Sequence, residues 1–105
     1  MTTSNEPGYY QEGSFGIRIE NVCITVKADT PYSFGGKTYC SFQTVTMVPI
    51  STKLIAIELL EDSELVWINE YNLKVQHTLM PLMQEKYPEA IEYLVRETKP
   101  LLRTL

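Results

Sequence analysis

The sequence predicts an α+β protein in which N-terminal β-hairpins are followed by C-terminal helices. Residues 1–48 alternate apolar and polar side chains between turn signals, whereas residues 62–105 repeat apolar side chains at helical spacing. Because the two patterns occupy separate halves of the chain, they favour α+β over an alternating α/β arrangement. The chain has 105 residues, of which 44% are hydrophobic and 21% charged, which suits a small soluble globular unit.

The strand half contains two predicted hairpins. A first strand is predicted over Asn5–Tyr10, and the turn signal Gln11–Ser14 follows it. The segment Ile17–Lys27 is rich in Ile and Val and is predicted to form one long return strand. A second turn is predicted in Asp29–Gly36, which ends in a pair of glycines, with Lys37–Val48 as its return strand.

The second half predicts two helices. The short apolar segment Leu54–Ile57 is expected to be extended, and a helix is expected to begin near Asp62 or Ser63, both good N-cap residues. Pro81 falls inside this helical pattern and predicts a kink or an end, while Pro88 suits the first turn of a last helix. The predicted core faces are Leu65, Ile68, Tyr71, Val75, Leu79 and Leu82 on the first helix, and Ile91, Leu94 and Val95 on the last.

Composition excludes several classes of function. The net charge is −4 and no cluster of Lys or Arg occurs, which argues against nucleic-acid binding. No apolar run is long enough for a membrane span, and no basic signal-peptide region opens the chain. Cys23 and Cys40 form no metal motif; both fall in predicted strands, where we expect buried, reduced thiols and hence a cytosolic setting.

The first predicted hairpin carries the residues with the clearest chemistry. If its turn is centred on Gly13, position 6 pairs with position 20, because the two numbers average 13. Glu6, Tyr10, Arg18 and Glu20 then share one face, since side chains alternate with period two. Opposed carboxylates repel each other, and a divalent cation between them removes the conflict. The pattern therefore indicates a metal-binding pair.

Pairing alone leaves a second interpretation open. A solvated hairpin whose exposed face happens to carry two glutamates and an arginine would show the same pattern, because register is uncertain from sequence. Pro7 cannot donate to a ladder, so Glu6 and Pro7 are expected at the edge or the start of a strand. That position is compatible with a site at a strand end but does not require one.

The chain also resembles a known family. Residues 5–22, NEPGYYQEGSFGIRIENV, look like the end of the catalytic domain of cytosolic Xaa-Pro aminopeptidases (aminopeptidase P), which are pita-bread metallopeptidases. Three further segments resemble the C-terminal extension of the long members of this family: TMVPI with TK (46–50, 52–53), WINEY (67–71) and EYLVRETKPL (92–101). The resemblance implies a partial pita-bread fold, with residues 1–50 ending the catalytic domain and residues 51–105 forming the helical extension.

The resemblance also implies a site and a reaction. The family binds two divalent metal ions, usually manganese, through two aspartates, one histidine and two glutamates. Glu6 matches the glutamate that binds one ion, and Glu20 the glutamate that bridges both. Tyr10 and Arg18 match residues that order the carboxylates and the substrate pocket. The implied reaction is hydrolysis, by an activated water, that removes the N-terminal residue from peptides with proline in second position.

The ligand set is incomplete in this chain. The family's aspartates and ligand histidine have no match here, and the only histidine, His77, is expected to be an ordinary helix-surface or packing residue. We therefore expect this chain to be a C-terminal fragment of a cytoplasmic hydrolase that alone binds no metal and is inactive. The alternative is a non-catalytic dimerisation module, because the extension contributes to the family's homodimer and unpaired strand edges invite association between chains.

Overall fold

The computed structural model describes residues 1–104. They form two compact units, Met1–Thr46 and a second unit that begins at Met47, and each unit is described separately. The first unit contains five strands, β1 (Thr2–Asn5), β2 (Gly8–Gln11), β3 (Phe15–Arg18), β4 (Asn21–Ala28) and β5 (Tyr39–Thr44). The second contains the helices α1 (Asp62–Lys86) and α2 (Ile91–Glu97) and the short 3₁₀ turns η1 (Thr52–Leu54), η2 (Ile57–Leu59) and η3 (Pro88–Ala90). Strands precede helices, as predicted.

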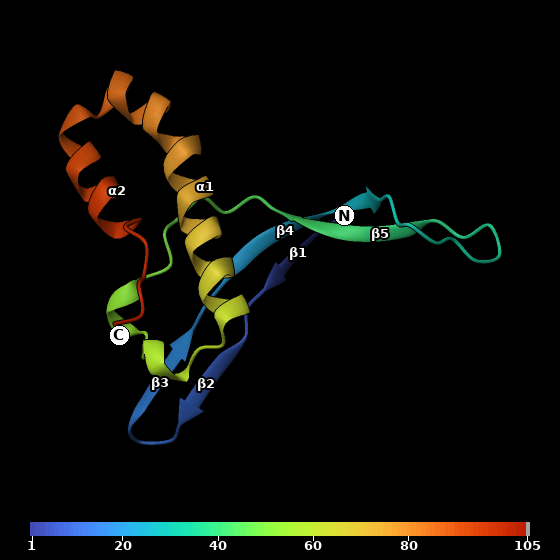
Figure 1. Ribbon diagram of the computed structural model, residues 1–105, viewed down its shortest axis with the longest axis horizontal. Helices are drawn as coiled ribbons and strands as arrows, with labels where there is room; N and C mark the ends of the chain where they lie inside the picture. Colours follow the sequence, from blue (N-terminus) through green and yellow to red (C-terminus); the bar gives the residue numbers. More distant parts are fainter. Residues whose placement is uncertain (105) are drawn as a thin grey trace. The chain divides into compact units, whose positions relative to one another are not determined.

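The strands form two antiparallel sheets. In the first, β4 lies between β1 and β5; in the second, β2 pairs only with β3 (Figure 1). Both predicted turns are present. Gly13 in the first turn has a φ of 69°, and Gly35 and Gly36 in the second have φ of 62° and 66°, a conformation that glycine adopts without steric cost.

The strand prediction was wrong about continuity. The predicted strand Asn5–Tyr10 is interrupted at Glu6 and Pro7, and the predicted strand Ile17–Lys27 is interrupted at Ile19 and Glu20. Proline has no N–H to donate to a ladder, so the pairing stops beside it. Strand β1 was not predicted, because its residues are all polar and exposed and it exists by pairing with β4.

The prediction that both cysteines are buried in strands is half right. Both are free and both lie in strands, but Cys23 is buried and Cys40 is exposed. Cys40 pairs with Lys27, near the end of the β4–β5 hairpin, beyond the part of β4 that β1 covers. With no third strand beside it, this end of the hairpin stays open to solvent.

The core of the second unit lies between α1 and α2. Figure 1 shows α2 folding back beside the C-terminal part of α1. The buried cluster consists of Ile50, Tyr71, Val75 and Leu94, with Met47, Ile55, Leu79, Met80 and Met83 packed around it. Of the predicted core residues, Leu82 and Val95 are instead exposed. Asn72, which was not predicted, is buried at 1% exposure.

Asn72 links α1 to the segment before it. Its Oδ1 accepts a hydrogen bond from the Ile50 N–H at 2.9 Å, and its Nδ2 donates to the Ile50 carbonyl at 3.2 Å. Close by, the Tyr71 hydroxyl donates to the Val48 carbonyl at 2.9 Å. These bonds satisfy backbone groups of a segment that belongs to no helix or strand, which is the usual condition for burying such groups.

The ends of the helices follow the sequence signals in part. Helix α1 begins at Asp62, as predicted, but its N-cap is Glu61, whose N–H donates to Glu64 Oε2 at 2.8 Å. The helix passes through Pro81 and does not end there. Pro88 opens the turn before α2, as predicted. The expected extended segment Leu54–Ile57 is partly right: Ile55 and Ala56 have extended backbone, but Leu54 ends the 3₁₀ turn η1 and Ile57 begins η2.

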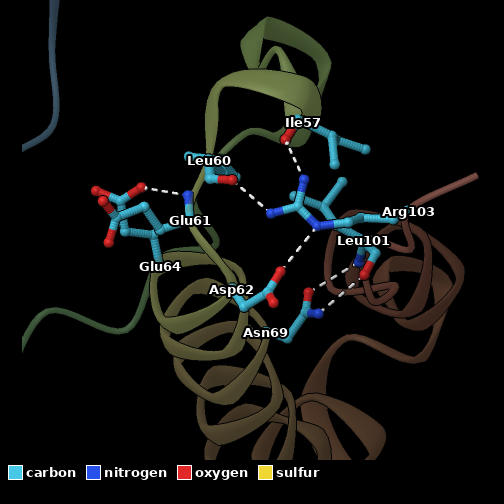
Figure 2. A network of polar contacts seen from close by, with 8 residues as sticks. All are labelled: Ile57, Leu60, Glu61, Asp62, Glu64, Asn69, Leu101 and Arg103. Carbon is cyan, nitrogen blue, oxygen red and sulfur yellow. Dashed lines mark hydrogen bonds and ion pairs between the residues drawn. The ribbon is translucent and has the colours of Figure 1, made fainter.

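A polar network fixes the C-terminal tail to the start of α1 (Figure 2). The Arg103 guanidinium donates to Asp62 Oδ1 at 3.0 Å and to the carbonyl oxygens of Ile57 and Leu60. Two turns further along α1, the Asn69 side chain bonds both the N–H and the carbonyl of Leu101, at 2.8 and 2.9 Å. The tail therefore closes over the η2–α1 corner although it has no secondary structure.

Candidate functional site

The hairpin β2–β3 has the predicted register. Gly8 pairs with Arg18 and Tyr10 with Gly16, so each pair of numbers averages 13. The pairs between β1 and β4 follow the same rule, since Asn5 pairs with Asn21. One register therefore runs through both sheets, although the ladder is interrupted between them.

Glu6 and Glu20 both lie in this interruption. The pairs Asn5–Asn21 and Gly8–Arg18 flank it on either side, so continuing the register sets position 6 opposite position 20. Across the gap, the Ile19 N–H donates to the Pro7 carbonyl at 3.2 Å. The two glutamates thus occupy opposed positions in a stretch that lies between the strands and not within them.

Glu6 is held at both carboxylate oxygens. Arg18 Nη1 donates to Oε2 at 2.9 Å, and the Ser4 hydroxyl donates to Oε1 at 3.3 Å. The side chains of Arg18 and Glu6 are 47% and 43% exposed, so the ion pair orients the carboxylate more than it stabilises the fold. Ser4 was missed, but its position two residues before Glu6 places it on the same face of an extended chain.

Arg18 remains charged at this site. The hydrogen bond to Glu6 is the largest cause that raises the pKa of Arg18, and Tyr10, the charge of Glu6 and Glu20 raise it further. Since arginine already titrates far above neutral pH, this pKa shift keeps a permanent positive charge beside the carboxylates. Arg18 thus offsets part of the repulsion between the two glutamates.

Tyr10 lies on the same face of the hairpin. It pairs across the strands with Gly16, and its ring covers both Gly16 and Gly8. The opposite face carries Tyr9 and Phe15, whose rings are in contact at 5.9 Å between centroids. The residues that sequence reasoning grouped together, Glu6, Tyr10 and Arg18, therefore come from neighbouring positions of one hairpin face.

The donor set fits part of a metal centre. Two carboxylates are suitable ligands for a hard divalent cation such as manganese, and each carboxylate oxygen of Glu6 can accept more than its present hydrogen bond. Among residues 1–104, however, no three His, Cys, Asp or Glu side chains gather closely enough to hold an ion. His77 is exposed on α1, as predicted, in the second unit.

No helix within residues 1–104 is both long and apolar enough to cross a membrane. The longest helix, α1, carries charged residues along its length and buries only one face.

Comparison with known proteins identifies relatives of the whole chain. A protein-family model described as the C-terminal region of peptidase M24 matches residues 38–101. A probable Xaa-Pro aminopeptidase P from Coprinopsis cinerea is 48% identical over 101 residues, which cover 96% of this chain and 16% of that protein. Aminopeptidase P2 from Arabidopsis thaliana is 42% identical over 103 residues, 98% of this chain and 14% of that protein.

A solved structure shows the same fold. The X-prolyl aminopeptidase of Caenorhabditis elegans, described as a cytosolic enzyme with a di-nuclear active site, superposes with a TM-score of 0.81 at 30% identity. The superposition covers 95% of this chain and 16% of that one. The match confirms the predicted fold, and it shows that the chain spans only about a sixth of the relative's length.

Proposed function

Because this chain belongs to the C-terminal region of the M24 peptidases, we propose that it completes the active site of a dinuclear Xaa-Pro aminopeptidase. The whole enzyme would remove the N-terminal residue from peptides with proline in second position. Residues 1–50 would end its catalytic domain, and residues 51–105 would form its C-terminal extension. The observation that carries this proposal is the register that sets Glu6 opposite Glu20 in a break of the ladder.

Each site residue has a role in this proposal. Glu6 and Glu20 would hold the metal ions, with manganese as the metal and Glu20 shared between the two, while Tyr10 and Arg18 would order the carboxylates and the substrate pocket. When bound, such ions polarise the peptide carbonyl and make water a stronger nucleophile. The contribution of this chain is to present the carboxylates: Arg18 and Ser4 hold Glu6 in one orientation, so less conformational freedom is lost when a ligand binds.

The proposal predicts that the chain alone is inactive and that joining it to an upstream region restores activity. A two-metal site needs more ligands than two glutamates. We expect no release of the N-terminal residue from an Xaa-Pro peptide by the 105-residue chain, even with manganese. A chimera, in which this chain replaces the matching C-terminal residues of the Coprinopsis cinerea relative, should release that residue.

The parent relative serves as the positive control in the same peptide assay. An inactive chimera that folds and binds manganese would contradict the proposal, because the segment would then be unable to complete the site. Hydrolysis by the isolated chain, at a rate near that of the parent, would contradict it too.

A second candidate function is dimerisation through the helical unit. Several large apolar side chains on its helices are exposed, namely Val66, Trp67, Leu73, Leu82, Tyr93 and Val95. Large exposed apolar side chains are candidates for contact with another chain. We predict that the chain is a dimer or a larger oligomer in solution. Multi-angle light scattering on size-exclusion fractions measures its mass, and a single monomer peak at micromolar concentration would contradict this prediction.

We also propose that the enzyme works in the cytoplasm. Both cysteines are free, and the worm relative is described as cytosolic. Reduced thiols are typical of that compartment.

A further inference from the structure

We propose that Gly8 and Gly16 are positioning residues: without side chains, they leave a strip of bare backbone on which the Tyr10 ring lies beside Arg18. The inference rests on the proposed function for its catalytic consequence, but its structural part can be tested without any activity.

The ring of Tyr10 occupies the space that side chains at both glycines would need. A Cβ at Gly8 would lie 2.7 Å from the Tyr10 Oη and 2.9 Å from Cε2 and Cζ. A Cβ at Gly16 would lie 2.6 Å from the Tyr10 Cδ1 and 3.1 Å from Cε1. Because these distances are below van der Waals contact, an alanine at either position would push the ring away.

Backbone conformation does not explain these two glycines. The glycines with positive φ are Gly13, Gly35 and Gly36, and a Cβ at any of those three would meet no neighbouring atom. Gly8 and Gly16 lie in β2 and β3 without positive φ, where a glycine weakens a strand. Close approach of another group is the usual reason for a glycine in a strand, and here that group is the Tyr10 ring.

The strip directs Tyr10 toward the carboxylates. The ring starts opposite Gly16 and extends along the strand to Gly8, so its hydroxyl ends over the residue that pairs with Arg18. Directly opposed positions have Cβ atoms about 4.5–5.5 Å apart. Arg18 in turn donates to Glu6. Tyr10 therefore restricts the space open to the guanidinium that orients Glu6.

The structural part is tested by NMR on the 105-residue chain. A ring lying over the backbone shifts nearby protons upfield, so we expect upfield Hα signals for Gly8 and Gly16 and NOEs from both to the Tyr10 ring. Tyr10→Leu should abolish the upfield shifts, whereas Tyr9→Leu, on the other face, should leave them. Random-coil Hα shifts at both glycines in a folded chain would overturn the inference.

The catalytic consequence is tested in the chimera by a double-mutant cycle. Gly16→Ala should lower kcat/KM and the apparent manganese affinity by about ten- to a hundredfold, the usual cost of losing a residue that orients a metal ligand. In a Tyr10→Ala background the ring is gone, so the same alanine should have no further effect. Ser14→Ala, in the turn, is the matched control and should behave as the unsubstituted chimera.

An equal loss from Gly16→Ala in both backgrounds would overturn the inference, because the glycine would then act independently of Tyr10. Failure of the proposed function has a different signature. In that case the upfield Hα shifts of the two glycines still depend on Tyr10, but Glu20→Gln leaves the rate of peptide hydrolysis unchanged.

Discussion

Replacing Glu20 by glutamine in the chimera is expected to lower kcat/KM by roughly 10³-fold, or about 4 kcal/mol of transition-state stabilisation. Glutamine keeps the size of the side chain but loses its charge and one acceptor oxygen. In the proposed site Glu20 would serve both ions, whereas Glu6 would serve one. We therefore expect Glu6→Gln to cost less than Glu20→Gln, and steady-state kinetics with an Xaa-Pro peptide measure both.

Unfolding cannot account for such a loss. Removing one of two opposed like charges should leave the metal-free hairpin as stable as before, or slightly more stable. Glu12→Gln is the matched control, because Glu12 lies in the exposed turn of the same hairpin and outside the site. If Glu20→Gln retained activity within a few-fold of Glu12→Gln, Glu20 would not be a metal ligand.

Replacing Asn72 by alanine is expected to destabilise the helical unit by about 2–3 kcal/mol. The Asn72 amide satisfies both the N–H and the carbonyl of Ile50, and all of these groups are buried. Alanine would leave two backbone groups without partners in an apolar core. Chemical denaturation followed by fluorescence measures the loss, because the single tryptophan, Trp67, lies in α1 beside Tyr71.

The control for Asn72 is Gln84→Ala, an exposed amide on the same helix. Such a surface substitution should change the free energy of unfolding by less than about 0.5 kcal/mol. A comparable small change for Asn72→Ala would mean that Ile50 finds other partners, or that water reaches it.

Much of the fold could be predicted because its signals are local. The turn at Gly13 and the alternation around it set the register of the first hairpin, and the spacing of apolar residues located both helices. The core residue Asn72 was missed because a polar side chain on an apolar stripe carries no burial signal. Its position, four residues after Ile68 and three before Val75, was nevertheless on the predicted face.

Only those features of the site that follow from strand pairing could be predicted from the sequence. Period-two alternation grouped Glu6 with Arg18, but it could not show that Ser4 also binds Glu6. Strand β1 escaped prediction since its four polar residues depend on pairing with the distant β4. The break that contains both glutamates was signalled by Pro7 alone, on one of the two strands.

Because a single register runs through both sheets, the number of residues in the turn decides whether Glu20 lies opposite Glu6. An exposed turn such as residues 12–14 is ordinarily a place where insertions and deletions are tolerated. If the turn kept its present tight form, one added residue would turn a whole strand face over, and two would move Glu20 out of its position opposite Glu6. We therefore expect this surface turn to accept many amino-acid types at positions other than Gly13, yet to resist any change in its number of residues.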